Sequence, residues 1–133
     1  MSVNRGLFTS SRDNWRTPKA FYEALDAEFH FDFDPCPYPA SLDGLVMRWG
    51  QRNFVNPPYG RQVGQWVKRA YEVSQEGALV VLLLASRTDT RWWHDYVMLA
   101  DEIRFIKGRL YFDDKGGPAP FPSVVVVFHE EAP

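Results

Sequence analysis

Apolar residues recur at helical spacing in three segments of the chain, and this pattern predicts three helices. The first covers residues 20–29 and directly follows Thr17-Pro18, where proline suits the first helical turn. The second covers 63–73 and the third 92–99. Residues 88–90 precede the third helix and offer the side-chain oxygens of an N-cap.

Strand patterns alternate with these helices. Residues 79–84 form a continuous aliphatic run, which is typical of a strand buried on both faces, so we expect this strand at the centre of the sheet. Shorter strands are predicted at 31–34, 53–55, 103–106, 110–112 and 124–128. Residues 35–51 contain three Pro and two Gly and are predicted to be mostly loop, with room for one helical turn.

The order of these elements predicts the fold class. Strands that alternate with helices imply parallel crossovers, and the last strands, which we expect to be joined by short turns, imply an antiparallel finish. We therefore predict an α/β protein, a three-layer sandwich with a parallel core and antiparallel C-terminal strands. Residues 1–14 are expected to be a flexible N-terminal segment and residues 15–133 a single domain.

Composition and charge exclude several classes of function. The net charge of −2 disfavours a basic protein that binds nucleic acid non-specifically, so any contact with a polyanion must be local. The longest apolar run, residues 78–85, is too short for a membrane span, which needs about 20 residues. A single cysteine and the lack of a basic-then-apolar leader lead us to expect a cytoplasmic protein. The 16% of aromatic residues exceeds the needs of a small core and suggests that planar rings are bound.

Metal and hydrolase chemistry have little support. Cys36, His30, His94 and His129 do not have the spacing of metal ligands, so we expect no metal site. No serine or cysteine lies in a hydrolase motif.

The motif Asn56-Pro57-Pro58-Tyr59-Gly60 carries the most specific chemistry in the chain. It lies between a predicted strand and a predicted helix, where two prolines make the loop rigid. The Asn56 side chain and the Pro57 carbonyl offer two acceptors for an amino group, and Tyr59 offers a flat ring. The motif alone equally suits a stiff strand-to-helix turn.

The motif and its surroundings resemble those of the phage-type DNA N6-adenine methyltransferases, which use S-adenosylmethionine. The matching segments occur in the same order over nearly the whole chain after residue 14: residues 15–18, 31–36, 43–49, 53–60, 66–70, 79–90, 108–112 and 121–123. The resemblance implies that the Asn56 side chain and the Pro57 carbonyl bind the N6 hydrogens of adenine. It further implies that Pro58 belongs to this catalytic loop and that Tyr59 stacks on a base that has left the duplex.

The resemblance also implies a cofactor site. Thr17 and Pro18 would lie near the methionine part of S-adenosylmethionine, Asp34-Pro35-Cys36 would follow the first strand, and Asp43 would bind the adenine amino group of the cofactor. Each of Thr17, Asp34 and Asp43 also suits a cap or a turn. A glycine-rich loop is missing, and residues 35–52 are too few for two further strand-helix units, so we expect a trimmed Rossmann-like sheet with an exposed cofactor edge.

DNA is the expected partner, and we expect neither a membrane nor an obligate protein partner. With no room for a separate recognition domain, contacts with DNA would come from loops around the site. The candidates are Arg61, Lys68, Arg87, Arg91 and Arg109, although an individual arginine is more typical of a solvated surface than of a DNA contact. Arg87 is the best candidate because it follows the central strand. Trp66, Trp92 and Trp93 are expected to be packing residues.

The activity predicted from the resemblance is adenine-N6 methylation of DNA by a phage or prophage protein in the cytoplasm of a bacterial host. Two alternatives stay open. The first is methylation of another conjugated amino group, cytosine N4 or a glutamine amide. The second is a module that binds the cofactor or DNA without catalysis.

Overall fold

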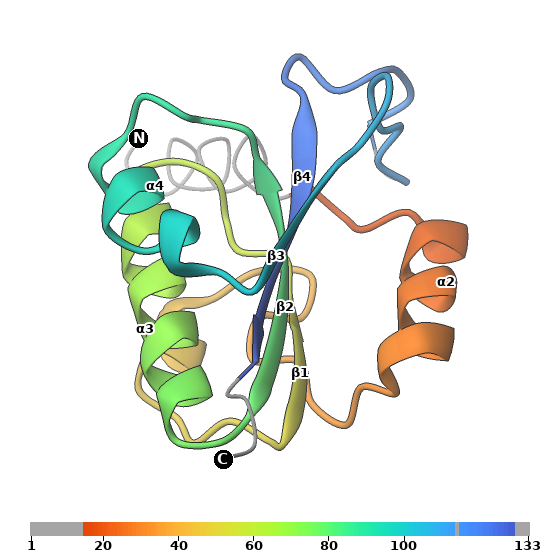
Figure 1. Ribbon diagram of the computed structural model, residues 1–133. Helices are drawn as coiled ribbons and strands as arrows, with labels where there is room; N and C mark the ends of the chain where they lie inside the picture. The colour runs from red at the N-terminus through yellow and green to blue at the C-terminus, as the bar shows by residue number, and fades with distance from the viewer. Residues whose placement is uncertain (1–14, 114, 130–133) are drawn as a thin grey trace, which may run out of the picture.

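The computed structural model describes residues 15–113 and 115–129, so the segment 1–14 that we predicted to be flexible lies outside the described residues. Within these residues an open four-stranded mixed sheet carries helices on both faces (Figure 1). The elements are α2 (Lys19–Phe29), the 3-10 helix η1 (Leu42–Leu45), β1 (Arg52–Val55), α3 (Val63–Gln75), β2 (Leu79–Ala85), α4 (Arg91–Asp95), the 3-10 helix η2 (Val97–Leu99), β3 (Glu102–Phe105) and β4 (Ser123–His129).

The sheet has the strand order β1-β2-β4-β3. β1 and β2 are parallel and are joined through α3, which is the predicted crossover. β4 is antiparallel to both of its neighbours, and it pairs with β2 from Leu79 opposite His129 to Ala85 opposite Ser123. The predicted change from parallel to antiparallel pairing is therefore confirmed.

β2 separates two hydrophobic cores. Every residue of β2 is buried, as its aliphatic run predicts. Val80, Leu82 and Leu84 face the core under α3 and α4, which Figure 1 shows on one side of the sheet. Leu79, Val81 and Leu83 face the core under α2 on the opposite side. Because successive side chains of a strand point to opposite faces of the sheet, β2 contributes residues to the hydrophobic cores on both sides.

The three predicted helices are present, although the third is broken. Residues 92–99 form α4 and then η2 rather than one continuous helix. Thr90 caps α4 as expected, because its Oγ1 accepts a hydrogen bond of 3.3 Å from the Trp93 N–H. The helical turn expected within 35–51 is η1.

Two predicted strands are wrong. The segment 31–34 makes only an isolated parallel bridge between Phe33 and Asn53, because Pro35 has no N–H to donate and the Asp34 side chain turns the backbone by accepting from the Cys36 N–H. The segment 110–112 is a loop whose backbone groups bond to other loops: the Leu110 carbonyl accepts from the Ala119 N–H at 2.8 Å. β3 and β4 are consequently joined by residues 106–122 and not by the short turn that we expected.

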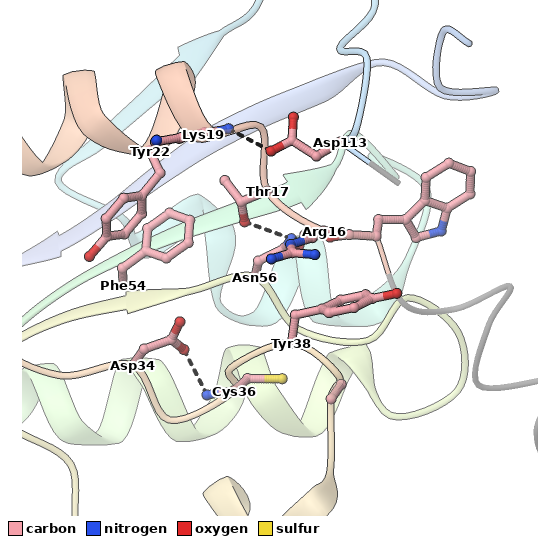
Figure 2. A pocket seen from close by; sticks show the side chains of 12 residues that line it. Arg16, Thr17, Lys19, Tyr22, Asp34, Cys36, Tyr38, Phe54, Asn56 and Asp113 are labelled. Atoms are coloured by element: carbon pink, nitrogen blue, oxygen red, sulfur yellow. Dashed lines mark hydrogen bonds between the residues drawn. The ribbon is translucent and has the colours of Figure 1, made fainter. Parts of the chain in front are cut away.

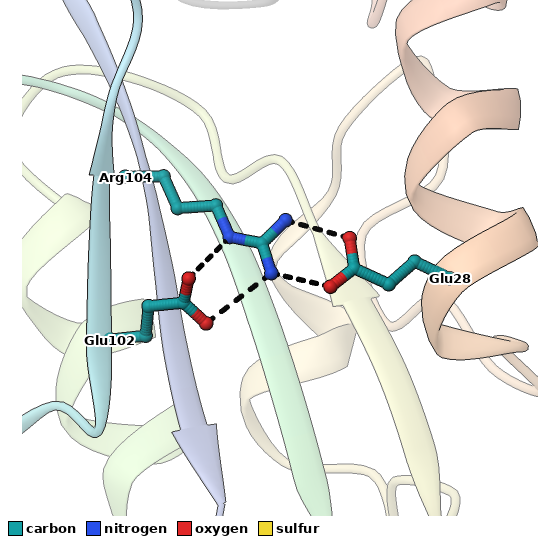
Figure 3. A network of polar contacts seen from close by, with 3 residues as sticks. All are labelled: Glu28, Glu102 and Arg104. Carbon is teal, nitrogen blue, oxygen red and sulfur yellow. Dashed lines mark hydrogen bonds and ion pairs between the residues drawn. The ribbon is translucent and has the colours of Figure 1, made fainter.

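Arg104 connects α2 to the edge strand β3. Its guanidinium donates to Glu28 Oε1 and to Glu102 Oε2, both at 2.7 Å (Figure 3). These hydrogen bonds hold the pKa of Glu28 below its ordinary value. The network is largely exposed, so we assign it a role in aligning α2 rather than a large share of stability.

No helix in residues 15–113 and 115–129 is both long and apolar enough to cross a membrane.

Candidate functional site

The rigid loop 56–60 begins where β1 ends, as the motif predicts. β1 is buried from Asn53 to Val55, and Asn56 is the first residue after this strand. Pro57 is buried, and Pro58 and Tyr59 are half-buried. The loop is therefore fixed against the sheet before any ligand binds.

The side-chain amide of Asn56 is held in one orientation. Its Nδ2 donates to the carbonyl of Trp15 and, at 2.9 Å, to Oγ1 of Thr17 (Figure 2). A backbone carbonyl can only accept a hydrogen bond, so the nitrogen must face Trp15 and the oxygen must face the other way. Asn56 Oδ1 is buried and has no hydrogen-bond partner among the described residues. A buried acceptor without a donor costs about 1–3 kcal/mol, which a ligand that carries an N–H would recover.

Asn56 lines a cavity of about 350 Å³, which we call the first cavity. The segment before α2, the loop after Phe33 and the end of β1 meet there. The lining residues are Trp15, Arg16, Thr17, Lys19, Tyr22, Asp34, Cys36, Tyr38, Ala40, Phe54, Asn56 and Asp113 (Figure 2). A cavity of this size falls within the range of small-molecule sites.

The structure brings several of the predicted cofactor residues to the first cavity. Thr17, Asp34 and Cys36 line it. Pro18 directly precedes α2 beside Thr17, outside the lining. Pro35 is buried next to Asp34.

Asp43 is the predicted cofactor residue that the structure places elsewhere. It is exposed on η1 and does not line the first cavity. Its backbone N–H binds the Ser41 hydroxyl at 3.3 Å, so it takes part in the start of that short helix.

Asp34 provides a partly buried carboxyl group in the first cavity. Burial raises its pKa from 3.8 to about 6, against the opposing effect of the hydrogen bond from the Cys36 N–H at 2.8 Å. Burial, together with the charge of Asp34, raises the pKa of the Cys36 thiol to about 12. The thiol is therefore protonated at neutral pH and a poor nucleophile. The described residues contain no group of three or more His, Cys, Asp or Glu side chains that could hold a metal ion.

Sequence reasoning missed most of the other residues that line the first cavity. Trp15 and Arg16 lie in a segment that matches the family resemblance, but the sequence analysis assigned them no role. No pattern in the sequence pointed to Tyr38. Arg16 and Tyr38 contact each other, with the guanidinium 5.3 Å from the centre of the ring. Asp113 is far from this segment in sequence, yet its carboxylate accepts from the Lys19 backbone N–H at 2.9 Å.

Tyr59 is held by one hydrogen bond and by aromatic packing. Its hydroxyl donates to the Leu83 carbonyl of β2 at 3.0 Å. Its ring makes edge contacts with Phe112 and Phe121, and Trp15 contacts the same two rings. Burial raises the pKa of the phenol, so it stays neutral at physiological pH.

Tyr59 does not line the first cavity but a second one, also of about 350 Å³. The second cavity is lined by Tyr59, Gly60, Arg61, Val63, Ala85, Arg87, Thr90 and Trp92. Two of the predicted DNA-binding residues, Arg61 and Arg87, thus come together at this cavity.

The other three predicted DNA-binding residues lie elsewhere on the surface. Lys68 on α3 and Arg91 at the start of α4 are exposed and line neither cavity. Arg109 is also exposed, and its guanidinium donates to the Ala119 carbonyl at 3.2 Å. Among the tryptophans, Trp66 and Trp93 are buried, as we expected, whereas Trp92 lines the second cavity.

Comparison with known proteins identifies the family. A family model described as DNA N-6-adenine-methyltransferase (Dam) matches residues 6–120, which include every residue named above for the two cavities. Comparison with curated proteins gave no match. The chain belongs to the DNA N-6-adenine-methyltransferase (Dam) family.

Proposed function

We propose that this protein methylates the N6 amino group of adenine in DNA, with S-adenosylmethionine as the methyl donor. The observation that carries the proposal is the buried Oδ1 of Asn56, which has no partner among the described residues while Nδ2 of the same amide is fixed by Trp15 and Thr17. The match to the Dam family supports adenine as the target.

The catalytic task of the loop 56–60 is to make a poor nucleophile reactive. The lone pair of the adenine amino group is conjugated into the ring. We assign Asn56 Oδ1 and the Pro57 carbonyl the role of binding the two amino hydrogens, which favours a pyramidal nitrogen and stabilises the positive charge that develops on it. Pro58 keeps the loop rigid, and Tyr59 would stack on the base, which offsets part of the cost of unstacking it.

S-adenosylmethionine supplies an activated methyl group on a positively charged sulfonium. The first cavity suits such a molecule, because Asp34 places a carboxyl group in it that has no cationic hydrogen-bond partner within residues 15–113 and 115–129. Thr17, Pro18, Pro35 and Cys36 are the other proposed cofactor residues. The Thr17 hydroxyl already accepts from Asn56, so it can still donate to a ligand.

Asp43 stays a prediction from the resemblance alone, because it is exposed and lies outside the lining of the first cavity.

We interpret the sheet as a trimmed Rossmann-like methyltransferase sheet. The bridge at Phe33 lies next to β1, and the parallel pair β1-β2 is followed by the antiparallel strand β4, which supports this interpretation. DNA is the proposed partner, bound through Arg61, Lys68, Arg87, Arg91 and Arg109. A phage or prophage origin and action in the bacterial cytoplasm agree with the resemblance.

The direct test is transfer of label from tritiated S-adenosylmethionine to unmethylated DNA, followed by mass spectrometry of the digested nucleosides. We expect N6-methyladenine. Asn56→Ala should lower kcat by about 10²–10³ because one acceptor for the developing charge is lost. Its cofactor affinity, measured by calorimetry, should stay within about twofold, since the variant keeps the carboxyl group of Asp34.

Gln65→Ala is the matched control, because it removes an exposed side-chain amide of α3 that lines neither cavity. Label in N4-methylcytosine would assign the same acceptors to the amino group of cytosine. Transfer to a glutamine amide is tested separately with protein as the substrate. Cofactor binding without any transfer would leave a non-catalytic module.

A further inference from the structure

The second cavity lies beside the site assigned to the target amino group and borders the same loop. Asn56 lines the first cavity, whereas Tyr59 and Gly60, a few residues further along the same loop, line the second. The other walls come from α3, the end of β2 and the start of α4. Under the proposed function, a ligand in the second cavity would therefore lie next to the base that stacks on Tyr59, without occupying the position of the target amino group at Asn56.

Two guanidinium groups at this cavity lack partners among the residues that the structure describes. Arg61 and Arg87 are both exposed, and within residues 15–113 and 115–129 neither has a hydrogen bond or an ion pair from its side chain. By contrast, Arg104 is paired with two carboxylates and Arg52 donates to the Phe29 carbonyl. Two unpaired guanidiniums at one cavity attract an anion, and phosphate matches their geometry.

The backbone fixes where Arg87 lies. The Thr90 hydroxyl donates to the Arg87 carbonyl at 2.7 Å, and the Thr90 N–H donates to the same carbonyl at 3.2 Å. The same hydroxyl caps α4 by accepting from Trp93. The segment 87–90 is thus a closed turn tied to a helix, so Arg87 projects from a fixed point.

The aromatic side chain that lines this cavity beside Tyr59 is that of Trp92. Trp92 is half-buried and packs closely against α3: a Cβ added to Gly64 would lie 3.2 Å from its Cδ1 atom. The absence of a side chain at Gly64 lets the indole lie against the helix. An aromatic ring held in this way is a platform on which a base can stack.

We propose that the second cavity binds a nucleotide that neighbours the target adenine in the same DNA strand, with its base against Trp92 and its phosphates against Arg61 and Arg87. The proposal rests on the proposed function, because it takes the target to be an adenine at Asn56. Such a site would let a chain with a net charge of −2 contact DNA locally. It would also make the base beside the target adenine a determinant of sequence specificity.

The test compares oligonucleotides that differ at one nucleotide. Methylated adenines are first mapped in unmodified bacterial DNA treated with the protein, and an oligonucleotide with one target adenine is made from the result. A second oligonucleotide carries an abasic residue beside the target, on the 5′ side in one version and on the 3′ side in another. For the wild type we expect an abasic residue on one side to lower kcat/KM by about tenfold, the effect of one lost stacking contact.

The variants assign that loss to the second cavity. Trp92→Leu should lower kcat/KM by about tenfold on the intact oligonucleotide and no further on the abasic one. Arg61→Ala and Arg87→Ala should each raise KM for DNA by several-fold and leave KM for the cofactor unchanged. Arg48→Ala is the matched control, because it removes the same charge from an exposed residue that lines neither cavity.

Three results would overturn the proposal. If Trp92→Leu lowers kcat/KM equally on the intact and the abasic oligonucleotides, Trp92 does not contact the base. If Arg87→Ala raises KM for DNA no more than Arg48→Ala does, Arg87 does not bind a phosphate. This comparison remains valid even if Trp92→Leu does not fold. Should the wild type methylate nothing, the proposed function fails, and fluorescence anisotropy with a labelled oligonucleotide then tests the cavity: binding weakened by Arg87→Ala no more than by Arg48→Ala overturns it.

Discussion

The Thr17 hydroxyl is one of two groups that orient Asn56. It accepts the Nδ2 proton at 2.9 Å, and the Trp15 carbonyl accepts the other. Thr17→Val keeps the shape of the side chain and removes this acceptor, so the amide can rotate away from its productive orientation. We expect kcat at saturating cofactor to fall by about tenfold, which corresponds to one hydrogen bond, and cofactor affinity to fall as well because the hydroxyl that could donate to the cofactor is lost. Single-turnover kinetics and calorimetry measure the two quantities.

Thr17→Ser is the control for this prediction, because it restores the hydroxyl and should return kcat to within about twofold of the wild type. The two measurements also distinguish orientation of the Asn56 amide from contact with the cofactor. Loss of cofactor affinity with kcat unchanged at saturation would limit Thr17 to the role that the resemblance gives it.

At the scale of elements, the sequence predicts local structure well and long-range contacts poorly. The helical spacing of residues 20–29 and 63–73 and the aliphatic run at 79–84 predict α2, α3 and β2, since each pattern depends on neighbouring residues. The segment 31–34 has the alternation of a strand, but strand pairing also needs backbone partners, which Pro35 denies.

The candidate site follows the same rule. The motif alone identified Asn56 as a candidate, and the structure adds that its amide is fixed by Trp15 and Thr17, which are about forty positions earlier in the chain. The sequence offered no means of pairing these residues. It also gave Trp92 a packing role, which is true of its contact with α3 but omits its place in the second cavity.

The short helix η1 contains a glycine, Gly44, that packs closely against the backbone at Pro35. A Cβ on Gly44 would lie 2.0 Å from the Pro35 carbonyl oxygen and 2.6 Å from a ring carbon of Trp66, and neither atom belongs to a flexible chain end. Gly44→Ala should therefore lower the free energy of unfolding by about 1–3 kcal/mol. Urea denaturation measures the change.

Gly117→Ala is the matched substitution, because a Cβ there meets nothing within 4 Å. It should change the free energy of unfolding by less than about 0.5 kcal/mol. Similar losses for the two variants would show that Gly44 is not a close-packed position.

For the whole molecule, charge and cavities together would decide how DNA is held under the proposed function. With a net charge of −2, the chain has no general attraction for a polyanion. The two cavities share the loop 56–60, with Asn56 in one and Tyr59 and Gly60 in the other. Under the proposals above, one rigid loop would present the target amino group on one side and a neighbouring nucleotide on the other, so selectivity would come from a few contacts beside the reacting atoms.

Stability of the whole molecule should depend on pH through Asp34. Its pKa is raised from 3.8 to about 6, so between these values the folded protein holds a proton that the unfolded chain has lost. The free energy of unfolding therefore falls as pH rises through this window, and the full cost is present above about pH 6. Asp34→Asn should remove this dependence and raise the free energy of unfolding at neutral pH by about 3 kcal/mol. Urea denaturation at several pH values checks this, with the exposed Asp95→Asn as the control; parallel curves for Asp34→Asn and the wild type would contradict the assignment.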